Sequence, residues 1–134
     1  MVYLVGYVGA LISFVVVDAM WLRLMGPLLY RPTLGDILLA ELRLGPAIAF
    51  YLSFPIGILV LAVLPALKAS SLASAVGSGI LFGALAYATY DLTNFATLRN
   101  WTLQLTVLDI VYGAIVSGFS AAVSFLMARS VSGP

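Results

Sequence analysis

Residues 2–25 read VYLVGYVGALISFVVVDAMWLRLM, and Asp18 and Arg23 are the only charged side chains in this run. A transmembrane α-helix needs roughly 20 consecutive, mostly apolar residues to cross the hydrocarbon core of a bilayer. The run is long enough, and Gly26 and Pro27 follow it directly as a signal for the end of a helix. The sequence therefore predicts a first transmembrane helix over residues 2–25.

Three more apolar segments follow, at about residues 45–67, 72–98 and 102–128. Because unpaired backbone groups are not tolerated in lipid, helices are the only plausible form for these spans. Hydrophobic residues make up 63% of the 134 residues and charged residues only 8%, too little charge for a soluble surface. The sequence predicts one all-α domain over residues 1–134, a polytopic bundle of four transmembrane helices.

The chain contains neither cysteine nor histidine. This excludes disulfides, thiolate or imidazole metal sites, and a Cys or His catalytic base. The net charge is +1 and no Lys/Arg cluster is present, so we expect no nucleic-acid partner. The sequence carries no phosphate-binding loop, dinucleotide fingerprint or nucleophile motif. We therefore expect no cofactor and no metal, and leave open whether the protein is an enzyme.

The longest connection, residues 26–44, holds four of the eleven charged residues. They are Arg31, Asp36, Glu41 and Arg43. Residues 36–44 are a candidate for a short amphipathic helix at the membrane interface. Four arginines lie on this side of the predicted topology, against Lys68 and Arg129 on the other. The excess predicts a multi-pass protein of the inner (cytoplasmic) membrane with the long loop in the cytoplasm.

Small and irregular residues predict how the helices pack. Gly79 and Gly83 form a G-x-x-x-G pattern in the third span, which lets helix backbones approach closely. We expect this face either to pack within the bundle or to form a homo-oligomer, in contact with membrane lipids elsewhere. Pro55 lies in the middle of the second span and is expected to kink it. The kink either shapes the bundle or opens a cavity beside the other helices.

Three acids lie inside apolar spans at one predicted depth. Asp18 lies eight residues before Gly26, and Asp91 eight before Arg99. Asp109 lies eight residues after Trp101. At about 1.5 Å per residue, all three carboxyls are expected ~12 Å in from the helix ends on the long-loop side. Ionisable residues at membrane depth are costly and are functional candidates by default.

Polar and aromatic side chains accompany these acids at helical spacings. The predicted ligand-binding or proton-binding site comprises Asp18, Asp91, Asp109, Asn94, Tyr87, Tyr90, Trp21, Tyr51, Tyr112 and Arg99. In the alternative interpretation each acid is structural, hydrogen-bonded by a neighbour or neutralised by Arg23, Arg43 or Arg99. For the three acids taken together, we favour a functional site over a purely structural role. Three like charges in one pocket disfavour ionisation, so one acid is expected to keep its proton at neutral pH.

Residues 90–101 read YDLTNFATLRNW. This string resembles the signature of the DUF2177 family of small bacterial membrane proteins. Asp18 followed by Trp21, and Asp109 near the start of the last span, look like further marks of that family. Gly45, Tyr51 and Pro65 fit as well. Tyr112 departs from the pattern, because we expect Trp there in many members, but it keeps an aromatic.

The resemblance covers nearly the whole chain, and what it implies is limited. It implies a four-helix membrane fold without an established activity. Family members are often encoded near lipid-modifying genes, such as those for cyclopropane-type fatty-acyl methyltransferases. The resemblance therefore favours a lipid-like or amphiphilic ligand.

Three functions stay open. In the first, the aspartate pocket binds or transports a small amphiphilic molecule, a lipid or a proton. In the second, the protein is a membrane enzyme that acts on a lipid with one aspartate as general acid or base. In the third, it is a structural accessory subunit of a larger membrane complex. The mid-depth acids and the kinked second span favour the first.

Overall fold

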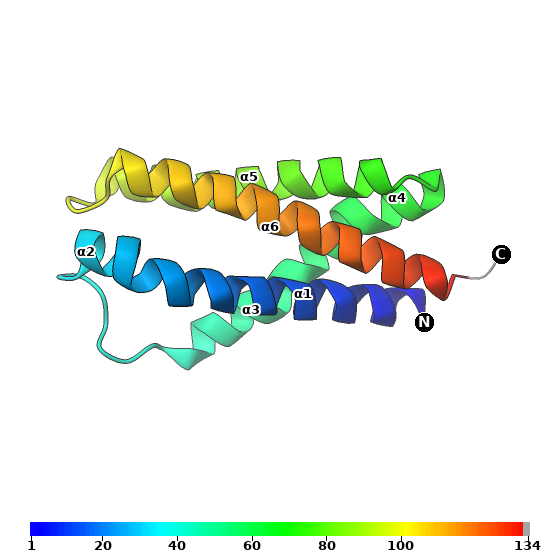
Figure 1. Cartoon of the computed structure of the whole chain (residues 1–134), viewed down its shortest axis with the longest axis horizontal. Helices are drawn as coiled ribbons and strands as arrows, with labels where there is room; N and C mark the ends of the chain where they lie inside the picture. The colour runs from blue at the N-terminus through cyan, green and yellow to red at the C-terminus, as the bar shows by residue number, and fades with distance from the viewer. Residues whose placement is uncertain (133–134) are drawn as a thin grey trace.

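The computed structural model describes residues 1–132, and the described part is helical with no strand. Four helical spans are long and apolar enough to cross a membrane, Val2–Leu34, Leu44–Ala69, Leu72–Thr97 and Leu103–Ser130. They run side by side along the long axis of the molecule, with both described ends of the chain at one end of the bundle (Figure 1). The predicted bundle of four transmembrane helices is confirmed.

The first span is longer than the sequence predicted. α1, Val2–Met25, continues through a π-helical turn, η1, Gly26–Tyr30, into the short helix α2, Arg31–Leu34. The α-helix ends at Met25, in agreement with the predicted bounds, but the helical span does not end there, because the wider π turn tolerates the loss of the backbone hydrogen bond that Pro27 cannot donate. Leu29 in the π turn and Leu34 in α2 pack in one apolar cluster with Trp101 and Leu105, at the start of the last span.

The short helix of the first connection lies earlier than predicted. Residues 36–43 form turns, bends and irregular backbone, so the interfacial helix expected at residues 36–44 is absent there. In Figure 1 this segment crosses from α2 to the distant start of the second span. Extended backbone covers about 3.3 Å per residue and a helix only ~1.5 Å, so the distance favours the extended form.

The second span crosses the bundle on a diagonal. It consists of α3, Leu44–Ile58, the π turn η2, Leu59–Val63, and α4, Leu64–Ala69. α3 continues through Pro55, and the π turn follows one helical turn later. In Figure 1, α3 lies beside α1, whereas α4 lies beside the third span. The long-loop end of α3 therefore diverges from the third span.

The last two helices pack tightly together. α5 spans Leu72–Thr97 and α6 spans Leu103–Ser130. A Cβ atom at Gly79 would lie 2.8 Å from the Ser117 carbonyl oxygen, and one at Gly83 would lie 2.3 Å from that of Gly113. Only glycine fits at both positions. The predicted homo-oligomer face is therefore not free, because α6 of the same chain fills it.

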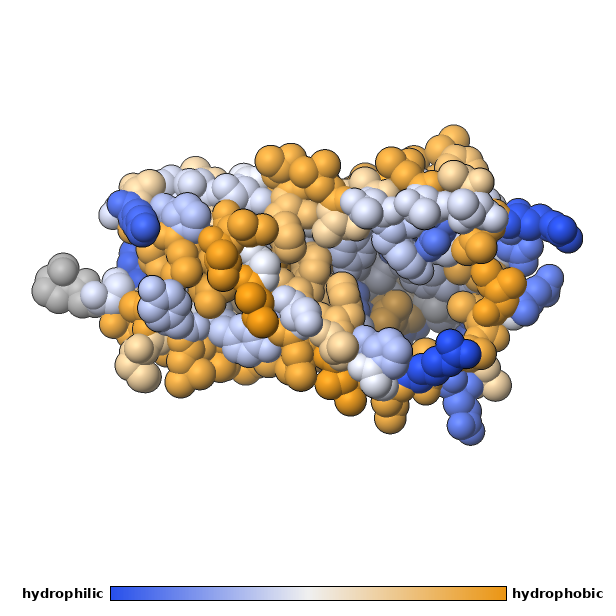
Figure 2. Space-filling model, turned by 180° about the vertical axis from the view of Figure 1, so that it is seen from behind, coloured by the Kyte–Doolittle hydropathy of each residue, from blue (hydrophilic) through white to orange (hydrophobic). Residues whose placement is uncertain are grey.

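The surface has the pattern of a membrane protein. Hydrophilic residues gather at the two ends, and the girdle between them is mostly hydrophobic (Figure 2). All six lysine and arginine side chains are exposed. On the face shown in Figure 2, the surface is hollowed toward the end that carries the long loop.

Candidate functional site

Asp18 lies at the junction of three spans. Its side chain is buried on α1 and accepts hydrogen bonds from the hydroxyls of Tyr51 on α3 and Tyr112 on α6. The bond from Tyr112 is 2.8 Å long. The Trp21 ring stacks on Tyr112 with 4.1 Å between ring centroids and an angle of 8°. Asp18 therefore links α1, α3 and α6 through two phenol donors.

Asp109 has a separate set of partners. It is buried on α6 and accepts a hydrogen bond of 2.5 Å from the hydroxyl of Tyr30 on η1. That hydroxyl in turn accepts a 2.9 Å bond from the Trp21 Nε1–H. Since Trp21 also stacks on Tyr112, it joins the surroundings of Asp109 to those of Asp18. The result is one connected network with two carboxyl centres.

Asp91 differs from the other two acids. Its side chain on α5 is completely buried, with 0% exposure. Neither carboxyl oxygen has a hydrogen-bond partner within residues 1–132. The carboxyl group of Asp109 lies next to it. A buried carboxyl group without a donor is costly in protein and in lipid, so this position suits a proton or another cation.

The structure brings together most of the predicted site residues. Tyr87 packs edge-to-face on Tyr112, with 6.1 Å between centroids, and so joins α5 to the network. Tyr90 is 57% exposed and lies edge-to-face against Trp101 at 5.5 Å. Asn94 is half-buried one turn further along α5. These residues form the α5 side of the site.

Arg99, the basic residue predicted for the site, lies outside the aspartate network. Arg99 is exposed and lines a shallow hollow at the loop end with Asp36 and Asn100. Arg23 and Arg43 are exposed as well. The carboxyl oxygens of Asp18 and Asp109 are hydrogen-bonded by tyrosines instead, so the expected neutralisation by arginine is not what holds these two acids.

Metal binding has no support in the arrangement of acids. Among residues 1–132, no three Asp, Glu, His or Cys side chains come together in a way that would hold a metal ion. Two of the three aspartates already direct oxygens at tyrosine hydroxyls. The three aspartates therefore do not form a ready metal-binding cluster in the described part of the chain.

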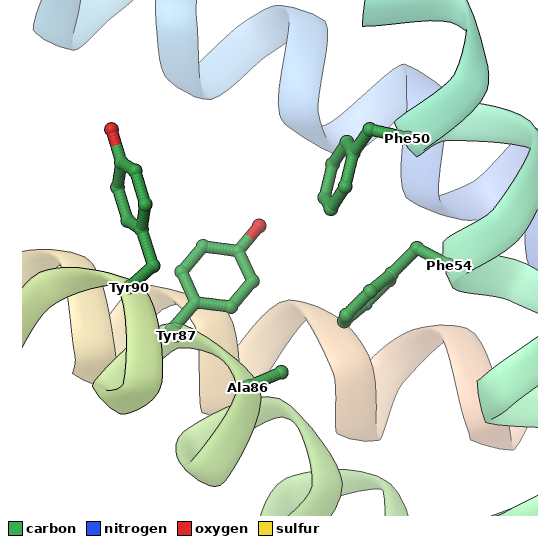
Figure 3. A pocket seen from close by; sticks show the side chains of 5 residues that line it. All are labelled: Phe50, Phe54, Ala86, Tyr87 and Tyr90. Atoms are coloured by element: carbon green, nitrogen blue, oxygen red, sulfur yellow. The ribbon is translucent and has the colours of Figure 1, made fainter. Parts of the chain in front are cut away.

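A cavity of about 390 Å³ lies beside the network, between α3 and α5. Its walls are Phe50, Phe54, Ala86, Tyr87 and Tyr90. In Figure 3 the two phenylalanine rings come from α3, and the Tyr87 hydroxyl points into the space opposite them. The volume lies in the range of small-molecule sites, and the walls are mainly apolar. Tyr87 is both a wall of the cavity and a neighbour of Tyr112.

Three residues of the site were missed by the sequence interpretation. Tyr30 was assigned to a loop because Pro27 was taken as the end of the first helix. Allowing the helix to continue past this proline would have kept it near Trp21. Phe50 and Phe54 lie one turn apart on α3, and the sequence gives no sign of whether that face meets lipid or a cavity.

Comparison with known proteins gives one match. A family model described as "Predicted membrane protein (DUF2177)" matches residues 3–126. No curated protein and no solved structure matches the chain. The match agrees with the resemblance seen at residues 90–101, and it carries no description of an activity.

Proposed function

This chain belongs to the DUF2177 family of membrane proteins, and we propose that it binds a small amphiphilic molecule from the membrane. The apolar part of the ligand occupies the cavity between α3 and α5. The polar part faces Tyr87 and the aspartate network behind it. The observation that carries the proposal is an aromatic-walled cavity of about 390 Å³, one wall of which, Tyr87, packs on Tyr112, the phenol that donates a hydrogen bond to Asp18.

The position of the cavity supports capture from the bilayer. α3 diverges from α5 at the long-loop end, so the cavity lies between two lipid-exposed helices. Three of its walls are aromatic side chains, and Phe54 contacts both Phe50 and Tyr87. Such walls supply a large apolar surface with little conformational freedom to lose. A ligand that partitions into lipid can reach this site without crossing the charged loop end.

The test is to fill the cavity and identify the occupant. Ala86→Trp places an indole in the cavity, and Leu85→Trp places the same group on the exposed face of α5 as a matched control. Mass spectrometry of extracts from the purified proteins should find an amphiphile with the wild type and with Leu85→Trp. Ala86→Trp should lack it. Identical extracts from all three proteins would count against the proposal.

Transport is the further step of the same proposal. Proteoliposomes with a pH gradient distinguish a transporter from a binding protein, because only a transporter accumulates or expels the amphiphile identified in the extract. We expect movement that depends on Asp91 and is blocked by Ala86→Trp. Binding without movement would restrict the function to binding.

We also propose that the long loop faces the cytoplasm, in the inner membrane. Arg31, Arg43 and Arg99 lie at the loop end and are exposed, whereas Lys68 and Arg129 lie at the other end. Because the chain has no cysteine, single substitutions can report the topology. A membrane-impermeant maleimide added to intact cells should label Ser70→Cys and not Leu39→Cys. The reverse pattern would invert the orientation.

A further inference from the structure

Charge is distributed unevenly between the interior and the surface. All six basic side chains are exposed, while three of the five acidic ones, Asp18, Asp91 and Asp109, are buried. The buried acids receive hydrogen bonds from neutral phenols. Phenols stabilise a carboxylate but do not cancel its charge. The interior of the bundle therefore lacks a cation of its own.

The lack of a compensating positive charge is greatest at Asp91. It is fully buried, both of its oxygens lack partners within residues 1–132, and another acid, Asp109, lies next to it. Two adjacent carboxyl groups in a low-dielectric environment favour the binding of one positive charge between or near them. A proton meets this need in the empty site. A ligand cation would meet it in the occupied one.

The cavity, whose walls Tyr87 and Tyr90 lie near these acids, suits an organic cation. Its walls include the faces or edges of four aromatic rings, those of Phe50, Phe54, Tyr87 and Tyr90. Aromatic rings attract ammonium-type cations within ~6 Å of their centroids, and the attraction grows when water is excluded. An anionic head group would meet the uncompensated acids and be repelled. A bare metal ion would find no group of ligands among the described residues.

We propose that the ligand is a lipophilic organic cation, an amine or onium group on an apolar body, which competes with a proton for the Asp91–Asp109 pair. This inference rests on the proposed function and names the ligand class. The apolar body fills the cavity, and the positive charge lies at Tyr87, on the side of the aspartates. When the cation binds, the proton held by the carboxyl pair leaves to solvent, so the charge of the interior is unchanged.

Competition with protons involves every titratable group that faces the pair. Tyr30 on η1 donates a hydrogen bond to Asp109, and Tyr87 and Tyr90 on α5 lie near the pair. Asp18, Tyr51 and Tyr112 form the adjoining part of the network. All the tyrosines are neutral phenols at physiological pH, so the carboxyl groups carry the exchange. Cation binding should therefore weaken as the pH falls.

The experiment compares two probes of similar size and opposite charge. Tetraphenylphosphonium and tetraphenylborate are added to the whole protein in nanodiscs of zwitterionic lipid, with empty nanodiscs as background. We expect saturable binding of the phosphonium and none of the borate. Asp91→Asn should weaken phosphonium binding by about tenfold or more. The control Asp36→Asn removes an exposed acid and should leave binding unchanged.

Each result decides between the two proposals. Lowering the pH should reduce phosphonium binding to the wild type and have a smaller effect on Asp91→Asn. Saturable binding of both probes, or binding that ignores Asp91, overturns the inference. A neutral or anionic occupant that is lost in Ala86→Trp also overturns it, but leaves the proposed function standing. If neither probe binds and no occupant depends on the cavity, both proposals fail.

Discussion

Asp18 and Asp91 are both buried aspartates on transmembrane helices, yet their surroundings are opposite. Asp18 accepts hydrogen bonds from two tyrosines, Tyr51 and Tyr112, that come from two other helices. Asp91 has no partner for either oxygen within the described chain and has Asp109 as its neighbour. We interpret Asp18 as a structural acid, whereas Asp91 is the acid to which we assign the proposed ligand. Buried polar groups are normally satisfied, and exceptions indicate where something else binds.

The contrast also divides the bundle into two regions. The region held by Asp18 lies where α1, α3 and α6 meet, next to the apolar core that contains Phe14 and Phe54. Asp91 lies on α5 next to Tyr90, which lines the cavity between α3 and α5. The hydrogen bonds that fix three helices around Asp18 leave this cavity open on the α5 side. Substitutions at the two aspartates should therefore have different effects on stability.

The largest effect on the free energy of unfolding is expected for Asp18→Ala. It leaves the hydroxyls of Tyr51 and Tyr112 buried without their acceptor and separates α1 from α3 and α6. Unsatisfied buried donors cost about 1–3 kcal/mol each in soluble proteins and somewhat less in membranes. We expect a loss of about 3 kcal/mol in the free energy of unfolding, measured by SDS titration followed by circular dichroism.

A rescue separates lost hydrogen bonds from lost packing. In the triple variant Asp18→Ala, Tyr51→Phe and Tyr112→Phe, neither hydroxyl remains to be satisfied. It should be more stable than Asp18→Ala alone, because replacing all partners by apolar groups is often nearly neutral. If the added tyrosine substitutions lower stability further, Asp18 does not act through these two bonds.

An intermediate effect is expected for Tyr30→Phe. The change removes the donor to Asp109 and the acceptor of the Trp21 Nε1–H, while the ring keeps its packing. Two hydrogen bonds at ~0.6–1 kcal/mol each predict a loss of about 1–2 kcal/mol. The same SDS titration measures it, and Trp21 fluorescence should change with it. Tyr3→Phe, an exposed tyrosine, is the control. Equal stability of the two variants would show that the Tyr30 link is unimportant.

The fold was largely predictable from the sequence, and the exception is instructive. Composition and segment length predict the four spans, because lipid admits only helices and closed barrels and apolar segments longer than about 20 residues suit helices. The end of the first span was mistaken because Pro27 stops an α-helix but not a helix that widens into a π turn. The same error hid Tyr30. The interfacial helix expected at residues 36–44 was misplaced, because an amphipathic pattern does not reveal the distance that a connection must cover.

The position of the site could be predicted from the sequence, but the hydrogen-bond partners of its acids could not. Equal spacing from the helix ends brings Asp18, Asp91 and Asp109 to one part of the bundle, and the structure shows all three buried there. Spacing does not reveal which acid has partners, since that depends on tyrosines of other helices. Arg99 was included for its charge and its place near the Tyr90–Asn94 string. Its exposed loop position shows that sequence proximity alone was misleading.

The smallest effect on stability, and the one of opposite sign, is expected for Asp91→Asn. The amide has the same shape, carries no charge and offers an N–H donor to the adjacent Asp109 carboxyl group. We expect the free energy of unfolding to stay the same or rise by about 1 kcal/mol, while phosphonium binding weakens by about tenfold or more. Infrared spectroscopy should show a protonated carboxyl band in the wild type that this substitution removes. A destabilisation as large as that of Asp18→Ala would mean that Asp91 has partners in the membrane, and the distinction between the two aspartates would disappear.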